Sequence, residues 1–167
     1  MKTLIKIIDL ISDYVARITC LSAYILLFVV IYEVIARKLF KSPTVWGFEL
    51  STMLYAAMFV LGGSYTLKQK GHVAIDLLTI RLKNKHKSII SIFTYLIFFF
   101  PFMITLVYAT GLFALQSWLD LERSQSPWNQ PLYHFKTLMP LGFGFLLLQG
   151  LSEFFKNIFT ILEDKKK

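Results

Sequence analysis

The stretch S-I-I-S-I-F-T-Y-L-I-F-F-F-P-F-M-I-T-L-V-Y-A-T-G-L-F-A-L-Q-S-W-L, residues 88–119, contains no charged side chain. A helix needs about 20 predominantly apolar residues to cross the hydrocarbon core of a bilayer. At about 1.5 Å per residue this stretch would be roughly 48 Å long, against a core of about 30 Å. It therefore predicts a membrane-spanning helix that tilts strongly or projects beyond the bilayer, with a kink at Pro101.

Three further segments have the same apolar character. With the first they predict spans at about 15–36, 48–67, 88–119 and 137–160. The chain of 167 residues is 56% hydrophobic and 17% charged, whereas soluble domains are about 25% charged. The fourth span carries Glu153 and Lys156 three residues apart, so these two are expected to face each other. The sequence thus predicts an all-α integral membrane protein, one membrane domain over residues 1–167 with four transmembrane helices.

The distribution of basic residues predicts the orientation. With four spans, both termini and the middle loop share one side of the membrane. That side holds thirteen basic residues: Lys2, Lys6, Arg17, Lys68, Lys70, Arg81, Lys83, Lys85, Lys87, Lys156, Lys165, Lys166 and Lys167. The other side holds five: Arg37, Lys38, Lys41, Arg123 and Lys136. By the positive-inside rule both termini are expected in the cytoplasm, and Trp46, Trp118 and Trp128 then fall at the outer face.

Two segments have the pattern of helices lying on the membrane surface. Near the N-terminus an apolar stripe comprises Leu4, Ile7, Ile8, Ile11 and Val15, with Lys6, Asp9 and Asp13 opposite. This predicts a short amphipathic helix leading into the first span. Residues 72–87 alternate polar and apolar positions at helical spacing and predict a second, cytoplasmic interfacial helix.

The net charge of +8 does not indicate nucleic-acid binding, because the basic residues flank apolar spans rather than forming a patch on a soluble face. Such flanks are expected to contact membrane lipids. No small-residue cleavage pattern follows the first apolar segment, so an uncleaved first helix is expected. The single cysteine, Cys20, excludes an intrachain disulfide and is expected to pack as a small apolar residue.

A search for chemistry finds no enzyme site. The three histidines His72, His86 and His134 lie in loops or at a membrane edge, whereas a bis-histidine haem needs ligands that face each other within the spans. No serine, cysteine or histidine arrangement resembles a nucleophile with its base, and no phosphate-binding glycine loop is present. We expect no catalytic residue, no cofactor and no metal in this chain.

A transport path through the chain is not evident either. Glu33 lies near the outer end of the first span and Glu49 begins the second, so neither is at mid-membrane. No span is broken at its centre by the Gly/Pro pairs that build midplane substrate sites. This favours a packing partner of a larger protein over a carrier that acts alone.

The strongest motif runs from the end of the first span into the middle loop. Residues 32–51 read Y-E-V-I-A-R-K-L-F-K-S-P-T-V-W-G-F-E-L-S, and residues 68–78 read K-Q-K-G-H-V-A-I-D-L-L. This pattern resembles the small membrane subunit (DctQ-like) of tripartite ATP-independent periplasmic (TRAP) transporters. The positions that match are Arg37, Trp46 with Glu49, Gly62 with Gly63, and His72 with Asp76; Pro140 and Gly142 in S-P-W-N-Q-P-L-Y-H-F-K-T-L-M-P-L-G-F also fit.

The resemblance covers nearly the whole chain and implies partners. A member of this family would bind a large, many-helix membrane subunit that carries the sodium-driven path, so sodium coupling is expected in that subunit. A periplasmic substrate-binding protein would deliver the substrate, commonly an organic acid with a carboxylate. The small subunit would sit in the bacterial inner membrane and enlarge the fixed scaffold. Its outer loops could also help to dock the binding protein.

The matching residues suggest structural roles, each with a simpler alternative. Arg37 and Glu49 could pair across the outer turn or be two solvated charges. Trp46 is expected to anchor the membrane interface rather than to dock a partner. Gly62 and Gly63 are expected to permit close helix packing rather than hinge motion, and Pro140 and Gly142 to shape the start of the fourth span rather than to act as a gate. His72 and Asp76, four residues apart, could hydrogen-bond to each other, and a structural or lipid-facing role is favoured over partner contact.

One rival hypothesis is a self-sufficient four-helix transporter of the multidrug type. That type uses a carboxylate within the first span and inserts in both orientations. Glu33 is the candidate carboxylate but lies near a span end, and thirteen basic residues against five is a strong orientation bias. An assembly factor or a small channel also stays open.

Overall fold

The computed structural model describes residues 2–69 and 84–164. Its helices are α1 (Lys2–Lys38), α2 (Gly47–Lys68), α4 (Asn84–Thr94), the π-helical turn η1 (Tyr95–Phe99), α5 (Phe100–Leu119) and α6 (Tyr133–Asp164). In this part of the chain, four helical segments are long and apolar enough to span a membrane: Thr3–Lys38, Gly47–Lys68, Lys87–Leu119 and Tyr133–Leu162. The prediction of an all-α protein with four transmembrane helices is confirmed.

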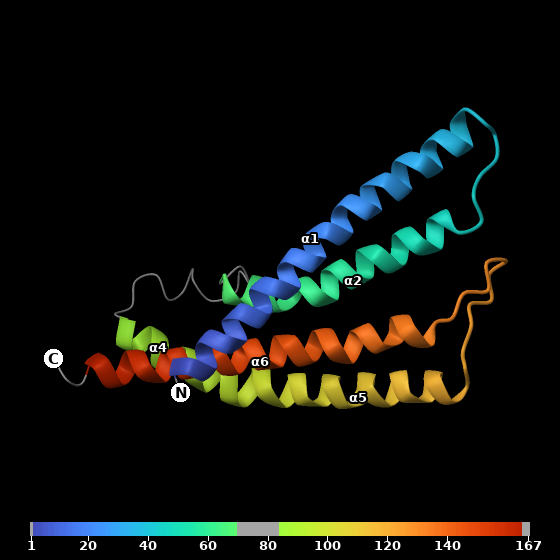
Figure 1. Cartoon of the computed structure of the whole chain (residues 1–167). Helices are drawn as coiled ribbons and strands as arrows, with labels where there is room; N and C mark the ends of the chain where they lie inside the picture. Colours follow the sequence, from blue (N-terminus) through green and yellow to red (C-terminus); the bar gives the residue numbers. More distant parts are fainter. Residues whose placement is uncertain (1, 70–83, 165–167) are drawn as a thin grey trace.

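The helices form two hairpins, α1 with α2 and α5 with α6 (Figure 1). Both termini lie at one end of the molecule, which we call the terminal end. The connections 39–46 and 120–132 lie at the opposite end, which we call the loop end. The hairpins meet along α2 and α6 and near the start of α1, and they diverge toward the loop end (Figure 1).

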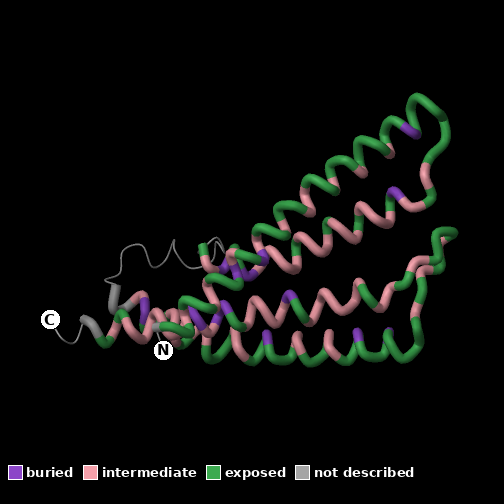
Figure 2. The backbone as a smooth tube through the Cα atoms, in the orientation of Figure 1, coloured by how far each residue is buried: buried purple, intermediate pink, exposed green. Residues whose placement is uncertain are grey.

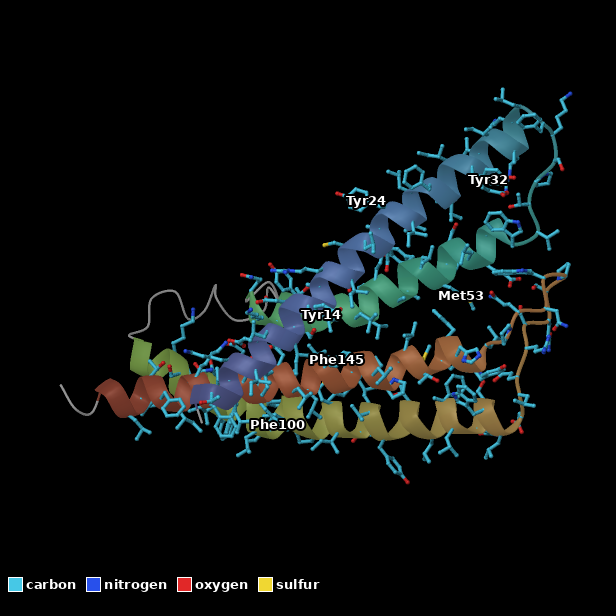
Figure 3. The ribbon with its side chains drawn as sticks, viewed as in Figure 1. Tyr14, Tyr24, Tyr32, Met53, Phe100 and Phe145 are labelled. Atoms are coloured by element: carbon cyan, nitrogen blue, oxygen red, sulfur yellow. The ribbon has the colours of Figure 1, made fainter. Side chains whose placement is uncertain are left out.

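Burial is inverted relative to a water-soluble protein. Ser12, Ser64, Ser117, Gln149 and Ser152 are the largest fully buried side chains of the described residues. Large apolar side chains cover the outside instead, and most of α1 and α5 is exposed (Figure 2). Tyr24, for example, points away from the other helices (Figure 3). This distribution is stable where lipid is the solvent, because apolar side chains lose nothing in hydrocarbon while polar ones need protein partners.

The third span is continuous but changes its helical type before Pro101. α4 and α5 are joined by the π-helical turn η1, and Pro101 stands at the start of α5. Proline has no N–H to donate to the carbonyl of Ile97, and its ring crowds that carbonyl. A π turn widens the helix at this point. The irregularity expected at Pro101 is therefore a π turn over the preceding residues, and Phe99 within it packs on Gly150 of α6.

The N-terminal segment differs from its prediction. It is not a separate surface helix, because α1 runs without a break from Lys2 to Lys38. Asp9, Asp13 and Ser12 face α6 and α2, while Leu4 and Ile7 on the apolar stripe are exposed. Most of the predicted interfacial helix at 72–87, with His72 and Asp76, lies outside the described residues.

Candidate functional site

The turn between α1 and α2 is organised by the carboxylate of Glu33. Glu33 accepts hydrogen bonds from Arg37 Nη2 at 2.9 Å, from Thr44 N at 3.2 Å and from the Thr44 hydroxyl. The Thr44 Oγ1 atom in turn accepts from Gly47 N at 3.1 Å, which satisfies a free N–H at the start of α2. We call Glu33, Arg37, Thr44 and Gly47 the Glu33 turn. It connects the end of α1 to the start of α2.

Gly47 leaves room for the Glu33 carboxylate in this turn. A Cβ atom built at Gly47 would lie 2.6 Å from Glu33 Oε2, closer than real Cβ atoms approach a neighbour. A side chain here would therefore displace the carboxylate. The sequence motif contained Gly47 between Trp46 and Glu49, but only the structure shows what it contacts.

Arg37 pairs with Glu33 rather than with Glu49, in contrast to the expected pair across the turn. The two residues are four apart on one helix, with the acidic residue N-terminal, which is the favourable order. The Glu33 side chain is 13% exposed and that of Arg37 is 61% exposed, so the carboxylate is held inside the turn while the guanidinium reaches outward.

Glu49 is left with an unused acceptor. Its Oε2 atom is buried and has no hydrogen-bond partner among the described residues. Glu49 lies four residues before Met53, so both face the same side of α2. Gln130 of the loop 120–132 approaches Met53 from the other hairpin, with 3.0 Å between its Nε2 atom and the sulfur, and Met53 points toward that hairpin (Figure 3). Glu49 thus faces the side on which the hairpins diverge.

Trp46 packs within the chain at the loop end. Its indole stacks on Tyr32 of α1, with ring centroids 5.7 Å apart and an interplanar angle of 17°. The ring is half-buried. The stack adds a second connection between α1 and α2 beside the Glu33 turn. One face of the Trp46 ring is therefore used within this chain.

A second polar cluster lies at the terminal end, where α1 crosses α6. Asp9 accepts hydrogen bonds from Gln149 Nε2, Ser152 Oγ and Lys156 Nζ, each at 3.0 Å. Its other oxygen lies 2.9 Å from the same ammonium group. Lys156 also pairs with Glu153 at 2.7 Å, as expected from their spacing, and Ser12 donates to Gln149 Oε1 at 2.7 Å. These six residues (Asp9, Ser12, Gln149, Ser152, Glu153 and Lys156) are named the Asp9 cluster.

The Asp9 cluster continues to α2 through an adjacent ion pair. Lys68 Nζ lies 2.5 Å from Asp13 Oδ1 and 3.1 Å from the carbonyl oxygen of Asp9. The last turn of α2 is therefore tied to α1, which is tied to α6. The sequence showed a polar face on the N-terminal segment and a polar series at Gln149, Ser152 and Glu153 on α6. No sequence pattern indicated that these two faces meet.

The glycines of the motif lie at helix contacts of unequal tightness. A Cβ at Gly62 or Gly63 would lie 3.8 Å from Thr19 of α1 or 3.9 Å from Leu146 of α6, which is ordinary contact. A Cβ at Gly142 would lie 2.9 Å from the carbonyl oxygen of Val60. Of these three glycines, Gly142 thus lies nearest to the backbone of a neighbouring helix, although it was expected only to shape the start of the span. Pro140 lies inside the continuous α6, two residues before Gly142.

A further contact joins the hairpin α5–α6 at the loop end. Lys136 pairs with Glu122 and lies 3.9 Å from the ring centroid of Phe113. The hydrogen bond from Lys136 lowers the pKa of the Glu122 carboxyl below its usual value. Trp118 donates from Nε1 to Thr137 at 2.9 Å, which holds the adjacent helix ends together.

The polar side chains of this protein therefore serve helix contacts. Among the described residues no group of three or more His, Cys, Asp or Glu side chains could hold a metal ion. Charged residues lie near the two ends of the spans and are mostly paired, while the outside is apolar. These features define a multi-pass membrane protein whose polar groups brace its own helices.

Comparison with known proteins gives the family. Residues 26–160 match the family described as "Tripartite ATP-independent periplasmic transporters, DctQ component". The chain belongs to this family and is a small subunit of a TRAP transporter, as the resemblance predicted. It is also 31% identical over 71 residues to the sialic acid TRAP transporter permease protein SiaT of Haemophilus influenzae (strain 86-028NP). That alignment covers 42% of this chain and 12% of the relative, so the chain spans a small part of that protein's length.

Proposed function

We propose that this chain is the scaffold subunit of a sodium-driven TRAP transporter for organic acids. It binds a large membrane subunit that carries the sodium-coupled path, and a periplasmic binding protein delivers the substrate to the complex. The family match carries this proposal. The inverted burial supports it, because a large apolar outer surface suits packing against another membrane protein as well as lipid.

The placement of charge supports a scaffold rather than a carrier. Residues 18–32, 50–67, 88–119 and 137–152 form the middle of the spans and contain no Asp, Glu, Lys or Arg. Intramembrane ionisable residues usually mark ion and substrate paths. Glu33, the candidate carboxylate for a self-sufficient transporter, is engaged by Arg37 and Thr44 in the Glu33 turn. The chain is proposed to have no enzyme activity and no bound cofactor.

The proposed orientation places the terminal end in the cytoplasm and the loop end in the periplasm of a bacterial inner membrane, following the basic residues. The loop end is then available to the periplasmic binding protein. A C-terminal fusion to a reporter that is active only in the cytoplasm is expected to be active. Activity of a reporter restricted to the periplasm would reverse the orientation.

The proposal is tested by purifying the tagged full chain from native membranes in mild detergent. Near-equal recovery of one large, many-helix membrane protein is expected, and an untagged strain is the control for nonspecific recovery. If only this chain is recovered, as a monomer or a dimer with itself, the scaffold proposal is overturned and the small self-sufficient transporter replaces it.

A further inference from the structure

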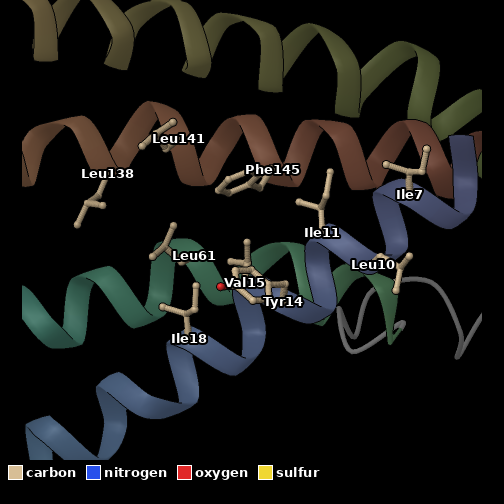
Figure 4. A pocket seen from close by; sticks show the side chains of 10 residues that line it. All are labelled: Ile7, Leu10, Ile11, Tyr14, Val15, Ile18, Leu61, Leu138, Leu141 and Phe145. Atoms are coloured by element: carbon tan, nitrogen blue, oxygen red, sulfur yellow. The ribbon is translucent and has the colours of Figure 1, made fainter.

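An apolar groove runs along the outside of the molecule where α1 crosses α2 and α6. Its volume is about 560 Å³, within the range of about 300–1,000 Å³ typical of small-molecule sites. Ten side chains line it: Ile7, Leu10, Ile11, Tyr14, Val15, Ile18, Leu61, Leu138, Leu141 and Phe145. Figure 4 shows the α6 side chains on one wall and those of α1 and α2 on the other.

The dimensions and lining of the groove fit a hydrocarbon chain. From Ile7 to Ile18 the α1 wall advances about 16 Å, close to the roughly 15 Å depth of one bilayer leaflet. Apart from the hydroxyl of Tyr14, the lining side chains are hydrocarbon, so they offer little to a polar ligand. The groove is open along its length, and its walls come from exposed faces such as that of Leu10, 65% exposed.

One edge of the groove is basic. Lys6 lies four residues before Leu10 and Arg17 lies three residues after Tyr14, so both project from the same side of α1 as these lining residues. Both are exposed, and neither forms an ion pair within the described residues. The acidic residue on that side, Asp13, is neutralised by Lys68.

We propose that this groove binds one phospholipid with an anionic headgroup. An acyl chain lies between α1 and α6, directed toward Leu141 and Leu138, and the phosphate contacts Lys6 beside Ile7, at the opposite end of the groove. The charge complementarity of the edge selects an anionic lipid over a neutral one. The inference depends on the membrane placement of the chain and not on the identity of its large partner subunit.

The test is native mass spectrometry of the full chain in mild detergent, titrated with phosphatidylglycerol or phosphatidylcholine. One retained phosphatidylglycerol is expected. Lys6→Gln is expected to lower the preference for phosphatidylglycerol about fivefold, whereas Arg17→Gln, about 16 Å further along α1, should lower it less. Lys38→Gln at the loop end is the control and should change nothing. Equal retention of both lipids by the unaltered chain would overturn the headgroup assignment.

The groove itself is tested by filling it. Leu141→Trp is expected to abolish retention of both lipids, whereas Leu112→Trp on α5 leaves it unchanged; the two leucines are 49% and 52% exposed, so the controls are matched. Equal retention by the two variants would overturn the site. Photo-reactive benzoyl-phenylalanine in place of Leu138 gives a second measurement, because it crosslinks to whatever molecule occupies the groove. A lipid-mass adduct supports the proposal, and an adduct with another protein chain contradicts it.

Discussion

The carboxylate of Asp9 lies 2.9 Å from the ammonium group of Lys156, although the two residues are 147 positions apart in the chain. This contact joins the first helix to the last at the terminal end. Gln149 and Ser152 donate to the same carboxylate, so its acceptor capacity is filled by α6. The pair therefore fixes where α1 crosses α6, and it sets one wall of the apolar groove.

Removing the Asp9 charge should loosen this crossing. The two side chains are 22% and 35% exposed, so the pair is neither fully buried nor at the surface. We expect Asp9→Asn to lower the unfolding free energy by roughly 2 kcal/mol, between the values for exposed and buried pairs. Thermal unfolding in detergent, in a double-mutant cycle with Lys156→Met, measures the coupling. Additive effects of the two changes would show that the pair does not contribute.

The contact of Gly142 with Val60 predicts a sharp difference between neighbouring glycines. Gly142→Ala places a methyl group against the backbone of α2 and should destabilise the chain by about 2 kcal/mol through overpacking. Gly144→Ala is the matched control, because a Cβ there meets nothing within 4 Å. Thermal unfolding of both variants gives the comparison, and a similar loss in both would contradict the close approach.

The geometry of the Glu33 turn predicts that Glu33 contributes more to the unfolding free energy than Arg37 does. Glu33→Ala removes the acceptor for Thr44 and should cost about 2 kcal/mol, because two part-buried donors lose their partner. Arg37→Ala removes only the exposed member of an i, i+4 pair and should cost less than about 1 kcal/mol. The ranking is read from the unfolding temperatures. The opposite ranking would mean that the guanidinium, not the carboxylate, holds the turn.

The unused oxygen of Glu49 predicts a variant that keeps the stability of the isolated chain but weakens its assembly with the large subunit. Because Oε2 has no partner in the described residues, Glu49→Gln should leave the isolated chain as stable as before. If a donor of the large subunit meets the half-exposed part of the Glu49 side chain, the same variant should reduce recovery of the complex about tenfold, as for loss of a charged hydrogen bond. Co-purification with the tagged chain measures this, with Glu122→Gln as the control. Undiminished recovery would remove Glu49 from the interface.

The Glu122–Lys136 pair predicts that the stability of the folded chain falls at acidic pH. The folded state lowers the Glu122 pKa through Lys136, so the unfolded state takes up a proton first as the pH falls. Stability from this group is fully present above its ordinary pKa near 4.5 and is lost as the pH falls through the lower folded value. Glu122→Gln should thus reduce the loss of unfolding temperature below about pH 4.5. Identical acid profiles for variant and parent would exclude this contribution.

Local sequence was sufficient for the number of spans and for contacts between near neighbours. Four apolar segments must be helical in lipid, because backbone groups there have no water to bond. The spacing of Glu153 and Lys156 predicted their contact for the same local reason, since residues three apart share a helix face. The family motif could also be recognised from the sequence, because it consists of residue types at fixed spacings along the chain.

Long-range pairing could not be derived in this way. Periodicity on one helix shows that a face is polar but not which other face it meets. The N-terminal stripe therefore looked like a surface helix, whereas its polar side contacts Gln149 and Lys156. Likewise, the sequence offered Arg37 two acidic partners, Glu33 and Glu49. In the folded turn Glu33 binds both Arg37 and Thr44, and Glu49 Oε2 has no partner among the described residues.

The sequence by itself determined that the chain is a four-helix membrane protein of the TRAP transporter small-subunit family, because hydropathy and a continuous motif are local properties. The tertiary structure alone decided how the hairpins cross, which glycine lies against the backbone of a neighbouring helix and where the apolar groove lies. These depend on the relative placement of α1, α2 and α6, which is fixed by the Asp9 cluster and by the Val60–Gly142 contact, between residues far apart in the chain.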